Sequence, residues 1–340
     1  MKNFKIILMS VAMLAASTLT ATIHNVNNLS PNPGQYSTPS AAVAAAMSGD
    51  TLLLAGTGMS YGSFNVDKQL TILGPGWIVN GGGYSGNAQV GTIALTTLSA
   101  AGTKVMGLRL FQINTNDGLI NIYTGITVQR CVIDDCIFTG NDDWSGCLIE
   151  GNLFTSPGAN TFSTAATSNI IASTIRNNIF NGIMYYVNSN LITQNIHLGN
   201  SNGNTAIVST GTGNTFTNNV VIGRNCNTID VTSTVNANIT YLCMNPNLPG
   251  AGNFPNTNPM FVNYVNGLYS WLHDFHLQAG SPALGMGVSG YDIGVYSGGG
   301  IYRKDGEPDI PVMRAATVTG GVIHPANSII QVSVIGVTHE

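Results

Sequence analysis

Carboxylates gather in one part of an otherwise nearly uncharged sequence. Between residues 117 and 150 they are Asp117, Asp134, Asp135, Asp142, Asp143 and Glu150. Two carboxyl groups with different pKa values can act as acid and base in glycoside hydrolysis. Several carboxylate oxygens together can instead hold Ca²⁺. A structural alternative is that Asp side chains accept hydrogen bonds from backbone amides at turns.

The carboxylates divide into two sets of candidates. Three are candidate catalytic groups, namely Asp117, Asp142 and Asp143, and because one coil takes about 20 residues, Asp117 could lie on the coil next to Asp134 and Asp135. The other three are candidate Ca²⁺ ligands, namely Asp134, Asp135 and Glu150. The sequence leaves catalysis, Ca²⁺ binding and turn capping open for both sets.

Candidate substrate-binding residues lie beside these carboxylates. Trp144 follows Asp143 directly and could offer an indole face on which a sugar ring stacks. Arg130 and Arg176 are the cations that we expect nearest to the acidic residues. Proton abstraction beside a uronate carboxylate needs a base and further positive charge, but the basic residues are scattered. An enzyme of this kind would be a polysaccharide lyase or a glycoside hydrolase, with an incomplete set of motifs.

The acidic residues lie within a run of short β-rich repeats. The repeats are CIFTG (136–140), NLFTS (152–156), NIFNG (178–182), NIHLG (195–199), NVVIG (219–223) and NITYL (238–242). Each run is too short for a helix and cannot bury a face alone. Stacked as coils of about 20 residues, the runs would form parallel ladders around one core. The recurring Asn fits the corners, where stacked amides can bond along the axis.

A short helix is predicted just before the first strands. In YSTPSAAVAAAMSGD (36–50), Thr38 is placed to cap the helix and Pro39 occupies its first position. The strands TLLLAG (51–56) and LTILGPG (70–76) follow. Because the end of a solenoid must be covered, we expect this helix to close the N-terminal end.

The two ends of this region resemble those of secreted right-handed parallel β-helix proteins of the pectin/pectate-lyase-like superfamily. The matching phrases are Ala41–Ala46, GDT (49–51), YGSF (61–64), LTILGPG (70–76), NPMFVN (258–263), DFHLQAGSPALGMG (274–287) and YDIGVY (291–296). The resemblance spans about residues 35–296. It implies an all-β, single-stranded right-handed parallel β-helix, with an N-terminal capping helix, a closing segment at 274–296 and a small C-terminal β appendage. It implies no single activity, because the same coil carries lyases, hydrolases, epimerases and non-enzymes.

Four segments are expected along the chain. Residues 1–21 have the charged start, apolar run and small-residue exit of a secretory signal peptide. Residues 22–296 form the β-helix domain with its cap, and residues 297–315 form a Gly- and Pro-rich linker. Residues 316–340 alternate like short strands and could contact a surface or the secretion machinery. We therefore expect a secreted or cell-surface protein without a membrane span after the signal is removed.

The amino-acid composition limits the classes of partner that the protein is expected to bind. Charged residues make up 8% of the chain and the net charge is −4, against about 25% charged residues in average domains. No basic cluster is present, so we expect no nucleic-acid partner. The main expectation is a protein that binds, and could cleave, an extracellular polysaccharide or cell-surface glycan. The alternative is a structural or adhesive protein that uses the coil as a rigid rod.

Overall fold

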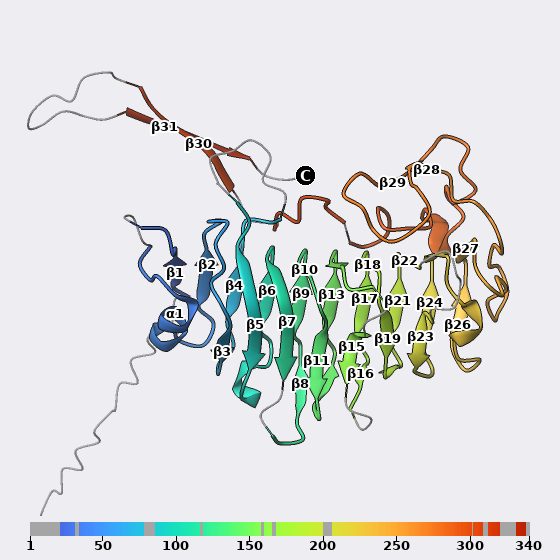
Figure 1. Cartoon of the computed structure of the whole chain (residues 1–340), viewed down its shortest axis with the longest axis horizontal. Helices are drawn as coiled ribbons and strands as arrows, with labels where there is room; N and C mark the ends of the chain where they lie inside the picture. Colours follow the sequence, from blue (N-terminus) through green and yellow to red (C-terminus); the bar gives the residue numbers. More distant parts are fainter. Residues whose placement is uncertain are drawn as a thin grey trace, which may run out of the picture.

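The computed structural model describes residues 21–30, 34–77, 86–115, 118–157, 160–164, 168–199, 206–300, 302–308, 312–319 and 331–337. The expected signal peptide, apart from its last residue, lies outside these ranges, and so does the candidate catalytic residue Asp117. Within them the chain winds into a right-handed parallel β-helix made of three sheets (Figure 1).

Sheet A runs the length of the coil and contains ten parallel strands. In order they are β1 (Ile23–Val26), β2 (Thr51–Leu54), β4 (Thr71–Leu73), β6 (Lys104–Met106), β9 (Thr127–Gln129), β13 (Leu148–Glu150), β17 (Thr174–Arg176), β21 (Leu191–Thr193), β24 (Thr215–Thr217) and β26 (Thr234–Asn236). Each strand pairs with the equivalent strand of the next coil, as the repeats predicted.

Sheet B begins with long strands and then divides. Its first strands are β3 (Phe64–Val66), β5 (Gln89–Leu95) and β7 (Arg109–Thr115). One branch continues from the start of β7 through β10 (Val132–Ile133), β14 (Leu153–Phe154), β18 (Ile179–Phe180), β22 (Ile196–Leu198), β25 (Val220–Ile222) and β27 (Ile239–Tyr241). The other continues from the end of β7 through β11 (Ile137–Gly140), β15 (Asn160–Thr164), β19 (Ile183–Tyr185) and β23 (Val208–Thr210).

The remaining elements are short. Sheet C comprises β8 (Ile122–Thr124), β12 (Asp143–Ser145), β16 (Ile170–Ile171) and β20 (Val187–Asn188). Two antiparallel pairs follow the coil, β28 (Phe261–Asn263) with β29 (Asp274–Leu277) and β30 (Val312–Thr319) with β31 (Gln331–Val337). The helical pieces are α1 (Pro39–Ala45), η1 (Leu98–Ala100), η2 (Cys226–Thr228) and η3 (Val288–Gly290). None of the helices in the described ranges has the length and apolar character to cross a bilayer.

Helix α1 forms where the sequence predicted it. Thr38 Oγ1 accepts a hydrogen bond from Ala41 N–H at 3.3 Å, and Pro39 is the first helical residue. Ala42 and Val43 are buried against the first coils. The helix therefore covers the N-terminal end of the core (Figure 1).

A ladder of buried asparagines joins the coils at the corner between sheets A and B. Its members are Asn152, Asn178, Asn195, Asn219, Asn238 and Asn253, one on each successive coil. From Asn178 onward, each side-chain oxygen accepts from both the backbone N–H and the side-chain amide of the preceding Asn, at 2.9–3.1 Å, and Asn152 Oδ1 accepts from Cys131 N–H at 2.9 Å. The predicted amide-to-amide stacking is confirmed, and these amides satisfy polar groups that would otherwise be buried without partners.

The residue before each ladder position turns the corner in the left-handed conformation. φ is 67° for Gly151, 52–57° for Asn177, Gln194, Asn218 and Ala237, and 75° for Gly252, and Arg130 at the same corner of the preceding coil has φ of 52°. Such a conformation is uncommon for residues other than Gly, and Asn tolerates it better than most. The repeated turn leaves the side chain at this position outside the coil, where it can bind other parts of the chain.

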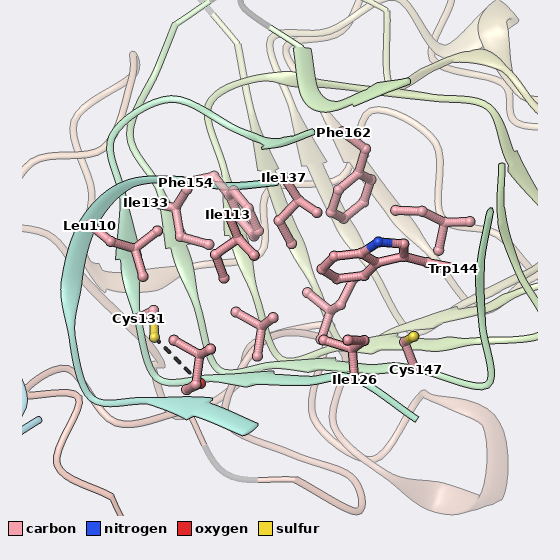
Figure 2. Close-up of a cluster of buried hydrophobic side chains, with 14 of the residues drawn as sticks. Leu110, Ile113, Ile126, Cys131, Ile133, Ile137, Trp144, Cys147, Phe154 and Phe162 are labelled. Carbon is pink, nitrogen blue, oxygen red and sulfur yellow. Dashed lines mark hydrogen bonds between the residues drawn. The ribbon is translucent and has the colours of Figure 1, made fainter. Parts of the chain in front are cut away.

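Apolar residues fill the interior of the coil. Figure 2 shows Leu110, Ile133 and Phe154 from successive coils, together with Phe162 and Trp144, pointing inward. The rings of Phe154 and Phe180 stack with centroids 5.0 Å apart. Stacking of like residues on successive coils therefore gives the interior the same repeat as the backbone.

A second apolar cluster lies outside the coil, on sheet B. The outward row comprises Val132, Leu153, Ile179, Ile196, Val220 and Ile239, all at most 1% exposed. Residues of the C-terminal lobe, defined as residues 258–300, cover much of this row, including Phe261, Phe275, Ile293 and Val295. We expected 274–296 to close the end of the coil. The lobe instead lies along its flank, because the outward row of sheet B is apolar and needs a cover.

The chain after β29 runs back along the coil. Four outward corner residues hold it: Val288 N–H donates to Asn218 Oδ1 (2.7 Å), Gln194 Nε2 to Asp292 O (3.0 Å), Asn177 Nδ2 to Val295 O (2.8 Å) and Arg130 Nη1 to Glu307 O (2.9 Å). Trp77, which follows β4, adds a bond from its Nε1 to Lys304 O (2.6 Å). Residues 302–308, which the sequence assigned to a linker, therefore form a strap packed on the coil. Figure 1 shows this segment following the edge of the β-helix.

Candidate functional site

Asp142 and Asp143 hold turns. Asp142 is fully buried, and its Oδ1 accepts from the N–H of Asn121 at 2.9 Å. Asp143 is half-buried, and its Oδ1 accepts from the N–H of Asn169 at 2.7 Å. These bonds bring successive coils together beside sheet C. Both candidate catalytic residues thus have the turn-capping contacts that the structural alternative requires, and Asp117 lies outside the described residues.

Trp144 belongs to the interior. Its side chain is fully buried, and the indole Nε1–H donates to Thr115 Oγ1 at 3.0 Å. The ring points into the coil in Figure 2. The expected sugar platform is therefore inaccessible in this structure, because alternation along β12 turns Trp144 inward between the outward-facing Asp143 and Ser145.

The candidate Ca²⁺ ligands lie on two different faces. Asp134 and Asp135 are on the outer side of sheet B, whereas Glu150 ends β13 of sheet A. Glu150 Oε2 forms an ion pair with Arg176, with nitrogens at 2.7 and 2.8 Å. Among the described residues, no three His, Cys, Asp or Glu side chains are grouped so that they could hold a metal ion.

The two candidate substrate-binding arginines act within the fold. Arg130 is 3% exposed and donates to the strap at Glu307 O. Arg176 pairs with Glu150 close to Gly299 and Gly300 of the C-terminal lobe. Arg130 therefore holds the returning C-terminal chain on the coil, and the Arg176–Glu150 pair lies beside that chain.

A hydrogen-bonded series of polar groups crosses sheet B where the lobe ends. The inward residues of four successive coils here are Leu110, Ile133, Phe154 and Phe180. The residue after each of them faces outward, and these outward residues are Phe111, Asp134, Thr155 and Asn181. We call the last three, together with Arg109, the polar strip. Coils are about 4.8 Å apart, so four coils span about 14 Å.

The bonds along the polar strip are continuous. Arg109 Nε lies 2.9 Å from Asp134 Oδ2, and Thr155 Oγ1 donates to Asp134 Oδ1 at 2.9 Å. Asn181 Nδ2 donates to Thr155 O at 3.1 Å, and Asn181 Oδ1 accepts from Tyr269 N–H of the lobe at 3.0 Å. Each side chain is therefore fixed by its neighbours, which leaves its orientation set before any ligand binds.

Aromatic rings lie at both ends of the polar strip. Trp271 is 46% exposed and meets Tyr269 edge to face, with ring centroids 5.2 Å apart. Burial raises the pKa of Tyr269 to about 12, so this phenol stays neutral. At the other end Phe111 is 52% exposed on β7. An exposed ring held in place near a hydroxyl and a pair of charged groups suits a weakly charged ligand with apolar and hydroxyl faces.

Sequence reasoning found only part of this surface. The sequence marks Asp134 only as a candidate Ca²⁺ ligand, and Arg109 belongs to the scattered basic residues that no motif distinguishes. Thr155 and Asn181 could have been found by aligning NLFTS with NIFNG, since each is the fourth residue of its phrase. Tyr269 and Trp271 carry no such signal, because they reach the coil only when the lobe folds back.

Compared with models of known protein families, the chain matches none, and comparison with curated proteins likewise gives no match. The parallel β-helix and the chemistry of its surface are therefore the basis for a functional proposal.

Proposed function

We propose that the protein is exported and binds an extended, weakly charged polysaccharide along the polar strip and Trp271. The observation that carries this proposal is the bonded series from Arg109 to Tyr269, which ends beside an exposed indole. Export is supported by the signal-like N-terminus, and a glycan partner agrees with a chain that is only 8% charged.

The chemistry of the surface supports binding in particular. A sugar ring can stack on Trp271, while its hydroxyls bond to the carboxylate of Asp134, the hydroxyl of Thr155 and the guanidinium of Arg109, which are already oriented. The Arg109–Asp134 pair is partly exposed and nearly cancels in charge. A polyuronate needs several unpaired cations, so neutral or weakly charged glycans fit better.

Replacing Trp271 by Ala tests the proposal. We expect binding to the polysaccharide to weaken roughly tenfold, or about 1.4 kcal/mol, because an aromatic anchor is lost. Titration calorimetry against a panel of neutral and acidic polysaccharides would identify the ligand and measure the change. Leu272→Ala is the matched control, since Leu272 is 79% exposed beside it and has no ring.

Equal affinity of the wild type and the Trp271→Ala variant would contradict the placement of the site. Failure of the wild-type protein to bind any member of the panel would favour the rod alternative. That alternative is supported by the Asn ladder, which joins the coils from Asn152 to Asn253.

A further inference from the structure

Two of the five cysteines lie together at the C-terminal end of the coil. Cys226 begins η2 just after β25, and Cys243 follows β27 on the next coil. Asn225 and Met244 form a parallel bridge between these coils. The Met244 N–H donates to Arg224 O at 3.0 Å and the Cys226 N–H donates to Met244 O at 3.2 Å. The backbone thus fixes the two cysteines on adjoining turns.

Their side chains face the same space. Cys226 is fully buried in the main core cluster, and the partly exposed Cys243 packs against that cluster. Cys243 Sγ lies 3.4 Å from Val221 O, on the coil that carries Cys226. The thiol of Cys226 donates a hydrogen bond to the sulfur of Cys243, which lowers the pKa of Cys243.

The other three cysteines lie on earlier coils. Cys131 and Cys147 donate to backbone carbonyls at their own corners, as Cys243 does to Tyr241 O, and Cys136 contacts Gln112 and Asp135. Burial raises the pKa of Cys131 to about 12 and that of Cys147 to about 11. A neutral, buried thiol is a poor nucleophile, so these residues serve as internal controls.

We infer that Cys226 and Cys243 form a disulfide bond that closes the last coil with strands in both sheet A and sheet B. Cys243 is partly exposed, so its thiolate attacks the disulfide of a small external oxidant and releases one thiol. The Cys226 thiol then loses its proton and attacks the Cys243 sulfur, which releases the second external thiol. Two protein thiols and one external disulfide thereby give one protein disulfide and two external thiols.

This bond would act where a solenoid is weakest. Terminal repeats have one neighbour and open first. The loop between the two cysteines contains β26 and β27, so the bond ties the start of this coil to its end. The inference is independent of polysaccharide binding.

The test is to equilibrate the reduced protein with oxidised and reduced glutathione at graded ratios, then alkylate it under denaturing conditions. Mass spectrometry of the digest should reveal a reductant-sensitive link between the 226 and 243 peptides, with Cys131, Cys136 and Cys147 alkylated. We expect the oxidised protein to melt about 5 °C higher than the reduced protein.

Variants separate this bond from other pairings. Cys243→Ser should abolish the link and the rise in melting temperature, whereas Cys131→Ser should keep the link. Alkylation of both Cys226 and Cys243 at every ratio would overturn the inference. Glutathione retained on either cysteine, or a link between two molecules, would overturn it as well.

Discussion

Replacing Asn195 by Ala is expected to lower the free energy of unfolding by about 3–5 kcal/mol. Its Oδ1 accepts from the backbone N–H of Asn178 at 2.9 Å and from the side-chain amide of Asn178 at 3.1 Å. Its Nδ2 donates to Ile175 O at 2.9 Å and to Asn219 Oδ1 at 3.0 Å. The variant leaves these buried groups without partners in the middle of the ladder, and each such group costs about 1–3 kcal/mol.

Urea unfolding followed by circular dichroism would measure this loss. Asn65→Ala is the matched control, because Asn65 is exposed on strand β3. Its stability should change by no more than about 0.5 kcal/mol. A loss below about 1 kcal/mol for Asn195→Ala, with the ladder otherwise intact, would show that the stacked amides contribute little to the fold.

His197→Phe is expected to remove a pH-dependent weakness of the core. The imidazole of His197 stacks on Phe180, with ring centroids 5.0 Å apart, lies tilted against Phe216, at 5.5 Å, and is 1% exposed. Burial lowers the pKa of His197 well below its ordinary value, and the nearby Arg224 guanidinium lowers it further. The folded protein therefore keeps this ring neutral.

The neutral state of His197 in the folded protein determines how its stability changes with pH. An unfolded chain protonates His197 below about pH 6.5, whereas the folded chain does not, so falling pH favours unfolding. The contribution reaches about 1.4 kcal/mol per pH unit below pH 6.5 and is absent above it. His197→Phe should be stabilised relative to wild type by about 2 kcal/mol more at pH 5 than at pH 8.

Unfolding midpoints measured from pH 5 to pH 8 would provide this comparison. His276→Asn is the control, since the His276 side chain is 59% exposed and pairs with Asp274 on the lobe surface. This control should retain the wild-type loss of stability on acidification. Parallel pH profiles for wild type and His197→Phe would contradict a neutral, buried His197.

The coil could be predicted from the sequence because its signals are local and repeated. Asn before a short apolar run recurs at coil spacing, and Thr38 and Pro39 mark the helix start by themselves. The position of the C-terminal lobe was missed, although a signal was present. In NIFNG both Ile179 and Phe180 are apolar, and adjacent apolar residues in a strand indicate a sheet covered on both faces. The apolar outward residue of each phrase therefore indicates that another part of the chain covers this side of sheet B.

The site was harder to predict for a physical reason. An Asp that caps a turn and an Asp that binds a ligand have the same sequence appearance, and only burial and bond partners separate Asp142 from Asp134. Tyr269 lies 88 residues beyond its partner Asn181. The repeat spacing relates residues on successive coils, but the lobe lies outside the coil. Contacts between the lobe and the coil therefore could not be predicted from the spacing.

The claim that the coil and the C-terminal lobe together form one glycan-binding surface can be tested by hydrogen-exchange mass spectrometry with and without a bound polysaccharide. Slower exchange is predicted in peptides that cover 109–112, 132–135, 153–156 and 268–273. Peptides from the outer face of sheet A, at 191–193 and 215–217, should be unchanged. Protection confined to sheet A, or none at a saturating concentration of ligand, would contradict the claim.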